Sequence, residues 1–131
     1  MVTMTAAQRR AVRKADYDVY MASCKSRLVL ERITDKWVSL VVCALGESDM
    51  RYAELNRRIA GVSQKMLTQT LRNLERDGLV TRTVAPTVPV SVTYSLTELG
   101  HGLHEVLQGI KVWAEEAAAE IIIARDRYDA G

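Results

Sequence analysis

Leucine residues recur at helical spacing in the middle of the chain. Leu67, Leu71 and Leu74 step by four and three residues, so at about 100° per residue they form one stripe of an amphipathic helix. Ser63 is a residue type that caps helix N-termini, and Gly78 is the type that most readily ends a helix. The pattern therefore predicts a helix of about fifteen residues with a buried leucine face.

The opposite face of this helix is polar and basic. It carries Lys65, Gln69, Arg72 and Arg76, with Gln64 and Thr68 on its flanks. Their donors and acceptors suit the base edges and phosphates of DNA. A solvated basic face is the alternative reading, and it is the weaker one because of the elements that surround the helix.

Those elements complete a helix-turn-helix and a wing. Residues 52–59 form a short amphipathic segment, which a glycine-containing turn at 60–62 joins to the leucine-striped helix. After Gly78, β-branched and polar residues alternate over 80–84 and again over 90–96, and both prolines of the chain lie between these runs. Helix, turn, helix and hairpin predict a winged helix-turn-helix, an α+β fold that is mainly α.

Further helices are predicted on both sides of this core. Residues 5–21 favour helix, and 36–45 form a mostly buried helix that supports the core. A long helix is expected to begin at Thr97. We therefore divide the single domain into a helical arm at 1–23, a DNA-binding core at 24–96 and a dimerisation helix at 97–131.

The long C-terminal helix keeps its apolar stripe for more than twenty residues, which exceeds what a small domain can cover. A second copy of the chain is the simplest cover for such a stripe. Packing of the stripe against residues 5–33 of the same chain is the alternative, and the two can coexist. The residues expected at the dimer interface are Leu103, Leu107, Ile110, Trp113 and Ala117.

Charge is distributed unevenly along the 131 residues. Residues 51–82 carry seven basic and three acidic groups, residues 83–96 carry none, and residues 97–131 carry three basic and seven acidic groups. The helix-turn-helix is thus the basic part of the chain, as a DNA-binding surface requires. No apolar run is long enough to span a bilayer, and the N-terminus does not resemble a secretory signal, so we expect a cytoplasmic protein without a membrane contact.

Other chemistry finds little support in the sequence. His101 and His104 lie three residues apart beside glutamates, but they lack a clear third and fourth metal ligand. There is no phosphate-binding glycine loop, CxxC motif or nucleophile elbow. We therefore expect no catalytic residue, no metal and no cofactor, and we do not expect an enzyme.

Five separated blocks of the sequence are Lys36-Trp37, 51–55, 62–71, 74–80 and 92–100. In order and spacing these blocks resemble the HxlR-type winged-helix transcriptional regulators of the MarR-like superfamily, and the resemblance spans Cys24 to Trp113. It implies that Cys24 occupies a position where the family commonly has a cysteine, which in some members senses oxidants or electrophiles. Lys25 replaces the usual following proline and Thr34-Asp35 the usual glycines before Lys36-Trp37, so a structural thiol is the alternative.

Together these observations predict a homodimeric transcriptional repressor that binds a pseudo-palindromic operator in double-stranded DNA, with an oxidant or small electrophile acting through Cys24. The alternatives are a winged-helix protein-interaction module without DNA binding, and a ligand-responsive regulator without thiol sensing. The residues expected to read bases are Ser63, Gln64, Lys65, Thr68 and Gln69. Those expected to meet phosphates or to lie in the wing are Arg51, Arg57, Arg58, Arg72, Arg76, Arg82 and Thr87.

Overall fold

The computed structural model describes residues 3–23 and 25–131, without the side chains of residues 20–23. Internal contacts divide the chain into two compact units, Met1–Asp35 and Lys36–Gly131. The first unit contains α1 (Ala6–Ser23) and α2 (Lys25–Ile33), so the helix predicted over 5–21 is present and a second one follows it. The three-part division with boundaries after residues 23 and 96 stays a prediction.

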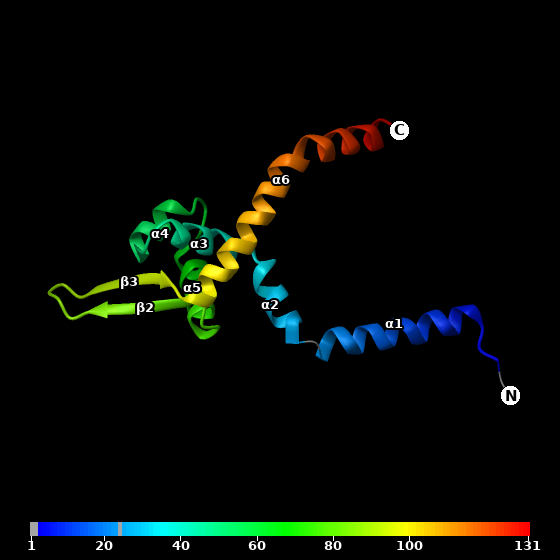
Figure 1. Ribbon diagram of the computed structural model, residues 1–131, viewed down its shortest axis with the longest axis horizontal. Coiled ribbons are helices and arrows are strands. Elements are labelled where there is room, and N and C mark those ends of the chain that lie inside the picture. The colour runs from blue at the N-terminus through cyan, green and yellow to red at the C-terminus, as the bar shows by residue number, and fades with distance from the viewer. Residues whose placement is uncertain (1–2, 24) are drawn as a thin grey trace. The chain divides into compact units, whose positions relative to one another are not determined.

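The second unit is a winged helix-turn-helix, which confirms the predicted fold class (Figure 1). Its elements follow in the order α3 (Lys36–Glu47), β1 (Met50–Arg51), α4 (Tyr52–Arg58), α5 (Gln64–Arg76), β2 (Val80–Ala85), β3 (Ser91–Leu96) and α6 (Glu98–Ala130). The two long strands form a hairpin that extends away from helices α3 to α5 (Figure 1). No helix in the described part of the chain is both long and apolar enough to cross a membrane.

Helix α3 lies at the centre of the core. It packs against α4, α5, α6 and β3, and its Val38, Val41 and Val42 are at most 2% exposed. The expectation that most of its residues are buried was too broad, since Trp37 and Cys43 are half-buried and Leu40 is exposed. The elements that pack on the helix cover one of its faces, and the other face is left open to solvent. The helix, predicted over 36–45, continues to Glu47.

The wing is part of a three-stranded antiparallel sheet with the order β1-β3-β2. In the register of the hairpin, Val80 lies opposite Leu96 and Arg82 opposite Tyr94. Strand β1 adds Met50 on the other side of Tyr94. Its two residues are too few to show an alternating pattern, so the sequence did not predict this strand.

Helix α6 begins where it was predicted to begin and runs for 33 residues. The hydroxyl oxygen of Thr97 accepts a hydrogen bond from the amide of Gly100 at 3.0 Å, which caps the helix. Leu107 is 7% exposed because this part of α6 packs on α3. Farther along, α6 leaves the core and its apolar side chains lie open to solvent.

Candidate nucleic-acid interface

Helix α5 is the recognition helix of the fold, and its two ends are fixed by local bonds. The hydroxyl oxygen of Ser63 accepts a hydrogen bond from the amide of Met66 at 3.1 Å. At the other end Gly78 adopts φ +75°, a conformation that costs side-chain-bearing residues free energy. Leu67, Leu71 and Leu74 are at most 2% exposed. The leucine stripe therefore faces the core as predicted, and the opposite face of α5 is open.

The predicted base-reading residues lie on or beside that open face. Ser63, Gln64, Lys65 and Gln69 are exposed and Thr68 is half-buried. Three of the five already have local partners. The Ser63 hydroxyl accepts the capping hydrogen bond from Met66. The Thr68 hydroxyl lies 3.2 Å from the hydroxyl of Tyr52, and the side-chain amide of Gln69 donates to Asn73 Oδ1 at 3.2 Å.

Tyr52 links the two helices of the helix-turn-helix through a hydrogen bond. It stands on the first turn of α4 and its hydroxyl donates to the carbonyl oxygen of Gln64 at 3.0 Å. This carbonyl belongs to the first turn of α5, so one side chain fixes the spacing between the two helices. Sequence reasoning missed Tyr52, because no local spacing shows that its hydroxyl meets a carbonyl twelve residues away.

The arginines expected at phosphates fall into two groups. Arg72 and Arg76 on α5, Arg82 on β2 and Arg57 on α4 are exposed, and their side chains have no hydrogen bond or ion pair to another described residue. Arg58 instead pairs with Glu47. Arg51 is the N-cap of α4, and its backbone amide donates to Glu54 Oε1 at 3.2 Å. Because Arg58 is already paired, we regard it as the weakest of these candidates.

The tip of the wing is uncharged and holds local hydrogen bonds. The hydroxyl of Thr87 donates to the carbonyl oxygen of Pro89 at 2.8 Å, and its amide donates to that of Ala85 at 2.8 Å. The hydroxyl that was predicted to face the minor groove is thus engaged within the tip. Residues 83–96 carry no charged side chain, so the wing offers shape and backbone groups to a partner.

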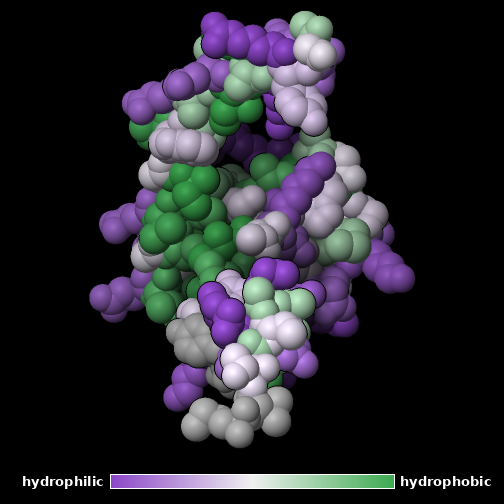
Figure 2. Space-filling model, turned by 90° about the vertical axis from the view of Figure 1, so that its right-hand side faces the viewer, coloured by the Kyte–Doolittle hydropathy of each residue, from purple (hydrophilic) through white to green (hydrophobic). Residues whose placement is uncertain are grey.

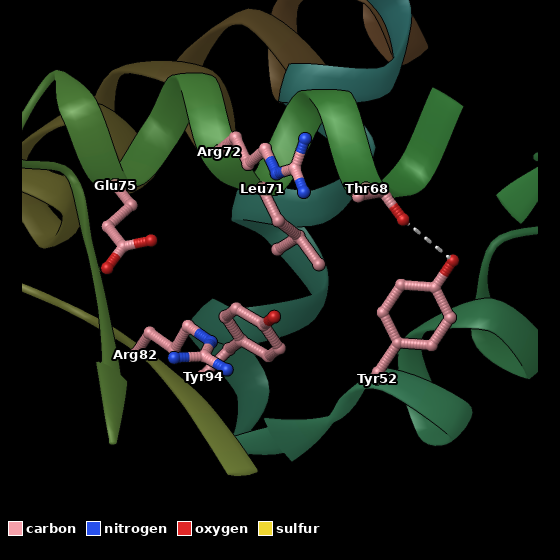
Figure 3. Close-up of a pocket in the computed structure, with 7 residues that line it drawn as sticks. All are labelled: Tyr52, Thr68, Leu71, Arg72, Glu75, Arg82 and Tyr94. Carbon is pink, nitrogen blue, oxygen red and sulfur yellow. Dashed lines mark hydrogen bonds between the residues drawn. The ribbon is translucent and has the colours of Figure 1, made fainter. Parts of the chain in front are cut away.

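A cavity of about 350 Å³ opens between α4, the recognition helix and the wing (Figure 3). Three of the residues predicted to contact DNA line it, namely Thr68, Arg72 and Arg82. The sequence did not single out its other four lining residues for this site, which are Tyr52, Leu71, Glu75 and Tyr94. Arg82 and Tyr94 lie opposite each other in the hairpin, but the hairpin pattern alone does not show that they line a cavity with α4 and α5.

The predicted dimer residues follow one face of α6. Leu103 and Ala117 are half-buried, and Leu107 is buried within the chain. Ile110 and Trp113 are 49% and 63% exposed. Hydrophobic side chains lie open on the molecular face shown in Figure 2. On the later turns of α6 the other large exposed ones are Val112, Ile121, Ile122, Ile123 and Tyr128.

Of the two cysteines, only Cys43 lies within the part of the chain that the structure describes. Cys24 lies outside the described residues. Cys43 is half-buried on α3, and this burial raises the pKa of its thiol. The charges of Lys111 and Glu47 have smaller effects, since Lys111 lowers that pKa and Glu47 raises it. A raised pKa leaves less thiolate at neutral pH, so Cys43 is the less reactive kind of thiol.

Comparison with known proteins agrees with this geometry. Residues 32–121 match the model of the HxlR-like helix-turn-helix family. The chain is 40% identical over 109 residues to the uncharacterised HTH-type transcriptional regulator YtfH of Escherichia coli K12, covering 83% of this chain and 86% of that protein.

Solved structures give the same result. A transcriptional regulator YtfH from Salmonella typhimurium superposes with a TM-score of 0.72 at 37% identity, over 80% of this chain and 94% of the other. The redox regulator HypR in its oxidized form gives 0.66 at 36% identity, over 71% and 96%. The chain therefore belongs to the HxlR-like helix-turn-helix family and is a transcriptional regulator of the helix-turn-helix type.

Proposed function

We propose that the protein is a homodimeric repressor that binds a pseudo-palindromic operator in double-stranded DNA. One observation carries this proposal. The open face of α5 presents Lys65, Gln69, Arg72 and Arg76, directly opposite a leucine stripe that is buried in the core. A helix held this way can enter the major groove with its polar face toward the base edges.

The distribution of charge supports the same surface. The segment 51–82 contains seven basic and three acidic groups, whereas 97–131 contains three basic and seven acidic ones. Arg82 at the base of the wing extends the basic face of α5 onto β2. Phosphates on both sides of one major groove are then within the reach of a single winged helix.

Dimerisation follows from α6. Ile110 and Trp113 lie exposed beyond the point where the helix leaves the core, and large apolar side chains in that setting favour a second copy of the same helix. Two recognition helices related by a twofold axis read two half-sites about 34–36 Å apart. If the operator overlaps a promoter, a dimer bound there would exclude the polymerase, which is the repressor role that we propose.

The test is selection of genomic DNA fragments by the purified protein at physiological salt, followed by footprinting of the enriched fragments. We expect a recurring motif with twofold symmetry and half-sites separated by one helical turn. Binding without sequence preference, or no enrichment at all, would instead favour a protein-interaction module. A promoter fusion carrying the motif should increase in expression when the gene for the regulator is deleted.

A second element of the proposal is regulation by oxidation at Cys24. The chain is similar over 71% of its length to HypR, which is described as a redox regulator. Lys25 and Arg27 follow Cys24 in the sequence, and nearby cations favour the thiolate. We expect diamide to release the operator from the wild type. We expect no such release from Cys24→Ser.

A further inference from the structure

The hydroxyl of Tyr52 contacts two polar groups on the N-terminal half of the recognition helix. It donates a hydrogen bond to the carbonyl oxygen of Gln64 at 3.0 Å. It also lies 3.2 Å from the hydroxyl of Thr68, in a hydrogen bond to which either oxygen could supply the proton (Figure 3). The direction of this second bond decides what the Thr68 hydroxyl can offer to a further partner.

The number of hydroxyl protons fixes that direction. A tyrosine hydroxyl carries one proton, and a carbonyl oxygen carries none. The proton of Tyr52 therefore lies between Tyr52 and Gln64, because two oxygen atoms 3.0 Å apart with no proton between them would repel each other. The bond between Tyr52 and Thr68 must then use the proton of Thr68. If Tyr52 donated to Thr68 instead, its contact with the Gln64 carbonyl would contain no proton.

A Thr68 hydroxyl that donates to Tyr52 has only its lone pairs left for DNA. Thr68 is half-buried, so part of its side chain stays open, and it stands on the half of α5 that enters the major groove in helix-turn-helix proteins. In that groove adenine N6 and cytosine N4 are donors, whereas thymine O4 and guanine O6 and N7 are acceptors. A threonine hydroxyl that is free to rotate can pair with either kind of group.

We propose that Tyr52 is a positioning residue that makes Thr68 a hydrogen-bond acceptor, so that Thr68 selects an amino base (adenine or cytosine) over a keto base (thymine or guanine) at one position of each half-site. This inference rests on the proposed function, because it takes α5 to lie in the major groove of an operator. A keto oxygen at that position would face the oxygen of Thr68 with no proton between them. Tyr52 thus affects specificity without touching the DNA.

The first measurement uses no DNA. Neutron diffraction from a deuterium-exchanged crystal of the free protein locates the deuterons of the two hydroxyl groups. We expect one on Tyr52, directed at the carbonyl oxygen of Gln64, and one on Thr68, directed at the oxygen of Tyr52. A deuteron on Tyr52 that points at Thr68 overturns the proposal, and so does a deuteron on Thr68 that points away from Tyr52.

The second measurement compares operators in which each position of the half-site carries each of the four bases in turn. Thr68→Val, which has no hydroxyl, identifies the position that Thr68 reads as the one where the variant loses its base preference. At this position the wild type should bind operators with an amino base about tenfold more tightly than operators with a keto base, as expected for one hydrogen bond to a base edge.

Tyr52→Phe gives the decisive comparison. Its Thr68 hydroxyl can rotate and donate to a keto oxygen, so the ratio of the affinities for amino-base and keto-base operators should fall toward one. A merely structural effect of the substitution would weaken both operators equally and leave that ratio unchanged.

Tyr94→Phe is the matched control for this substitution. Tyr94 is also a half-buried tyrosine, and in the described part of the chain its hydroxyl forms no hydrogen bond to another residue. This variant should keep the wild-type ratio of affinities. The proposal is overturned if Tyr52→Phe keeps that ratio as well, or if the wild type prefers keto bases at the position that Thr68 reads.

The two measurements separate this inference from the proposed function. A protein that binds DNA without sequence preference would refute the proposed function, and base reading by Thr68 with it, whereas the proton directions are decided by diffraction alone. A protein that selects operators, but whose preference Thr68→Val changes at no position, would refute the role of Thr68 and leave the proposed function standing.

Discussion

The hydroxyl of Thr97 donates a hydrogen bond to the carbonyl oxygen of Gly78 at 2.6 Å. The backbone amide of Thr97 donates to the carbonyl oxygen of Leu79 at 3.1 Å, and Thr97 also caps α6. One residue thus joins the start of α6 to the end of the recognition helix. If α6 is the dimerisation helix, the orientation of each recognition helix in the dimer depends on this junction.

Gly100 tests how tight the junction is. A Cβ atom at this position would lie 2.1 Å from the carbonyl oxygen of Leu79, whereas one at Gly102 would meet no atom within 4 Å. Gly100→Ala should therefore destabilise the fold by about 1–3 kcal/mol. Gly102→Ala should stabilise it by about 0.5–1 kcal/mol, because alanine is the better helix former. Urea unfolding of both variants gives the comparison, and equal stabilities would show that the junction tolerates a side chain.

Gln69 is the sharpest test of base reading. It is exposed on α5, and its side chain bonds to Asn73 on the same helix, so its loss should leave the fold intact. Gln69→Ala should reduce discrimination at one position of each half-site by about 1–3 kcal/mol. The measurement compares affinities for the operator, for operators changed at single positions, and for random DNA. An equal loss of affinity for all of these DNAs would mean that Gln69 contacts the sugar-phosphate backbone of the DNA and not the bases.

Arg72 is expected to bind a phosphate. Its replacement by alanine should lower the slope of log affinity against log salt by about one per subunit, since one fewer counterion is released. Arg127, exposed near the end of α6, is the matched control, and Arg127→Ala should keep the wild-type slope. A salt titration by fluorescence anisotropy decides the matter, and an unchanged slope for Arg72→Ala removes this residue from the interface.

The sequence predicted most of the winged helix because its signals are local. Ser63, Gly78 and Thr97 act on neighbouring backbone groups, and the leucine stripe of α5 needs only the helical period. Such signals do not depend on which partner the element meets. For the same reason the helix-turn-helix and the hairpin were expected at nearly the positions where they occur.

Features that depend on tertiary contacts could not be predicted in the same way. The cavity brings Tyr52, Glu75 and Tyr94 together from three elements, and no spacing in the chain encodes that meeting. Strand β1 exists because Met50 pairs with Tyr94, more than forty residues away. One side of α3 stays open because the neighbouring elements cover only its other face. The apolar run in the sequence does not show this, so it predicted more burial than the structure has.

Ile110 tests the assembly. Because its side chain is 49% exposed in the single chain, a charge there should cost the fold of one subunit little. In a dimer seam the same charge would be buried without a partner and would break the interface. Ile110→Glu should therefore sediment as a folded monomer and lose most of its operator affinity. Val112→Glu, on the opposite side of α6, should remain a dimer. A wild type that is monomeric at micromolar concentration would end this prediction.

The last prediction concerns the two thiols. Burial raises the pKa of Cys43, so at neutral pH its thiolate fraction is small, and its reaction with diamide should be slow and should accelerate as the pH rises toward that pKa. Cys24, beside Lys25 and Arg27 in the sequence, should react first. A bulky adduct or an inter-subunit disulfide that shifts the binding equilibrium by about 1.4 kcal/mol changes operator occupancy about tenfold. We therefore expect diamide to release the operator from the wild type and from Cys43→Ser at pH 7, but not from Cys24→Ser, with release measured by anisotropy and adducts by mass spectrometry. If Cys24→Ser releases DNA as readily as the wild type, Cys24 is not the sensor. The alternative, a regulator that responds to a ligand without thiol sensing, would then be favoured.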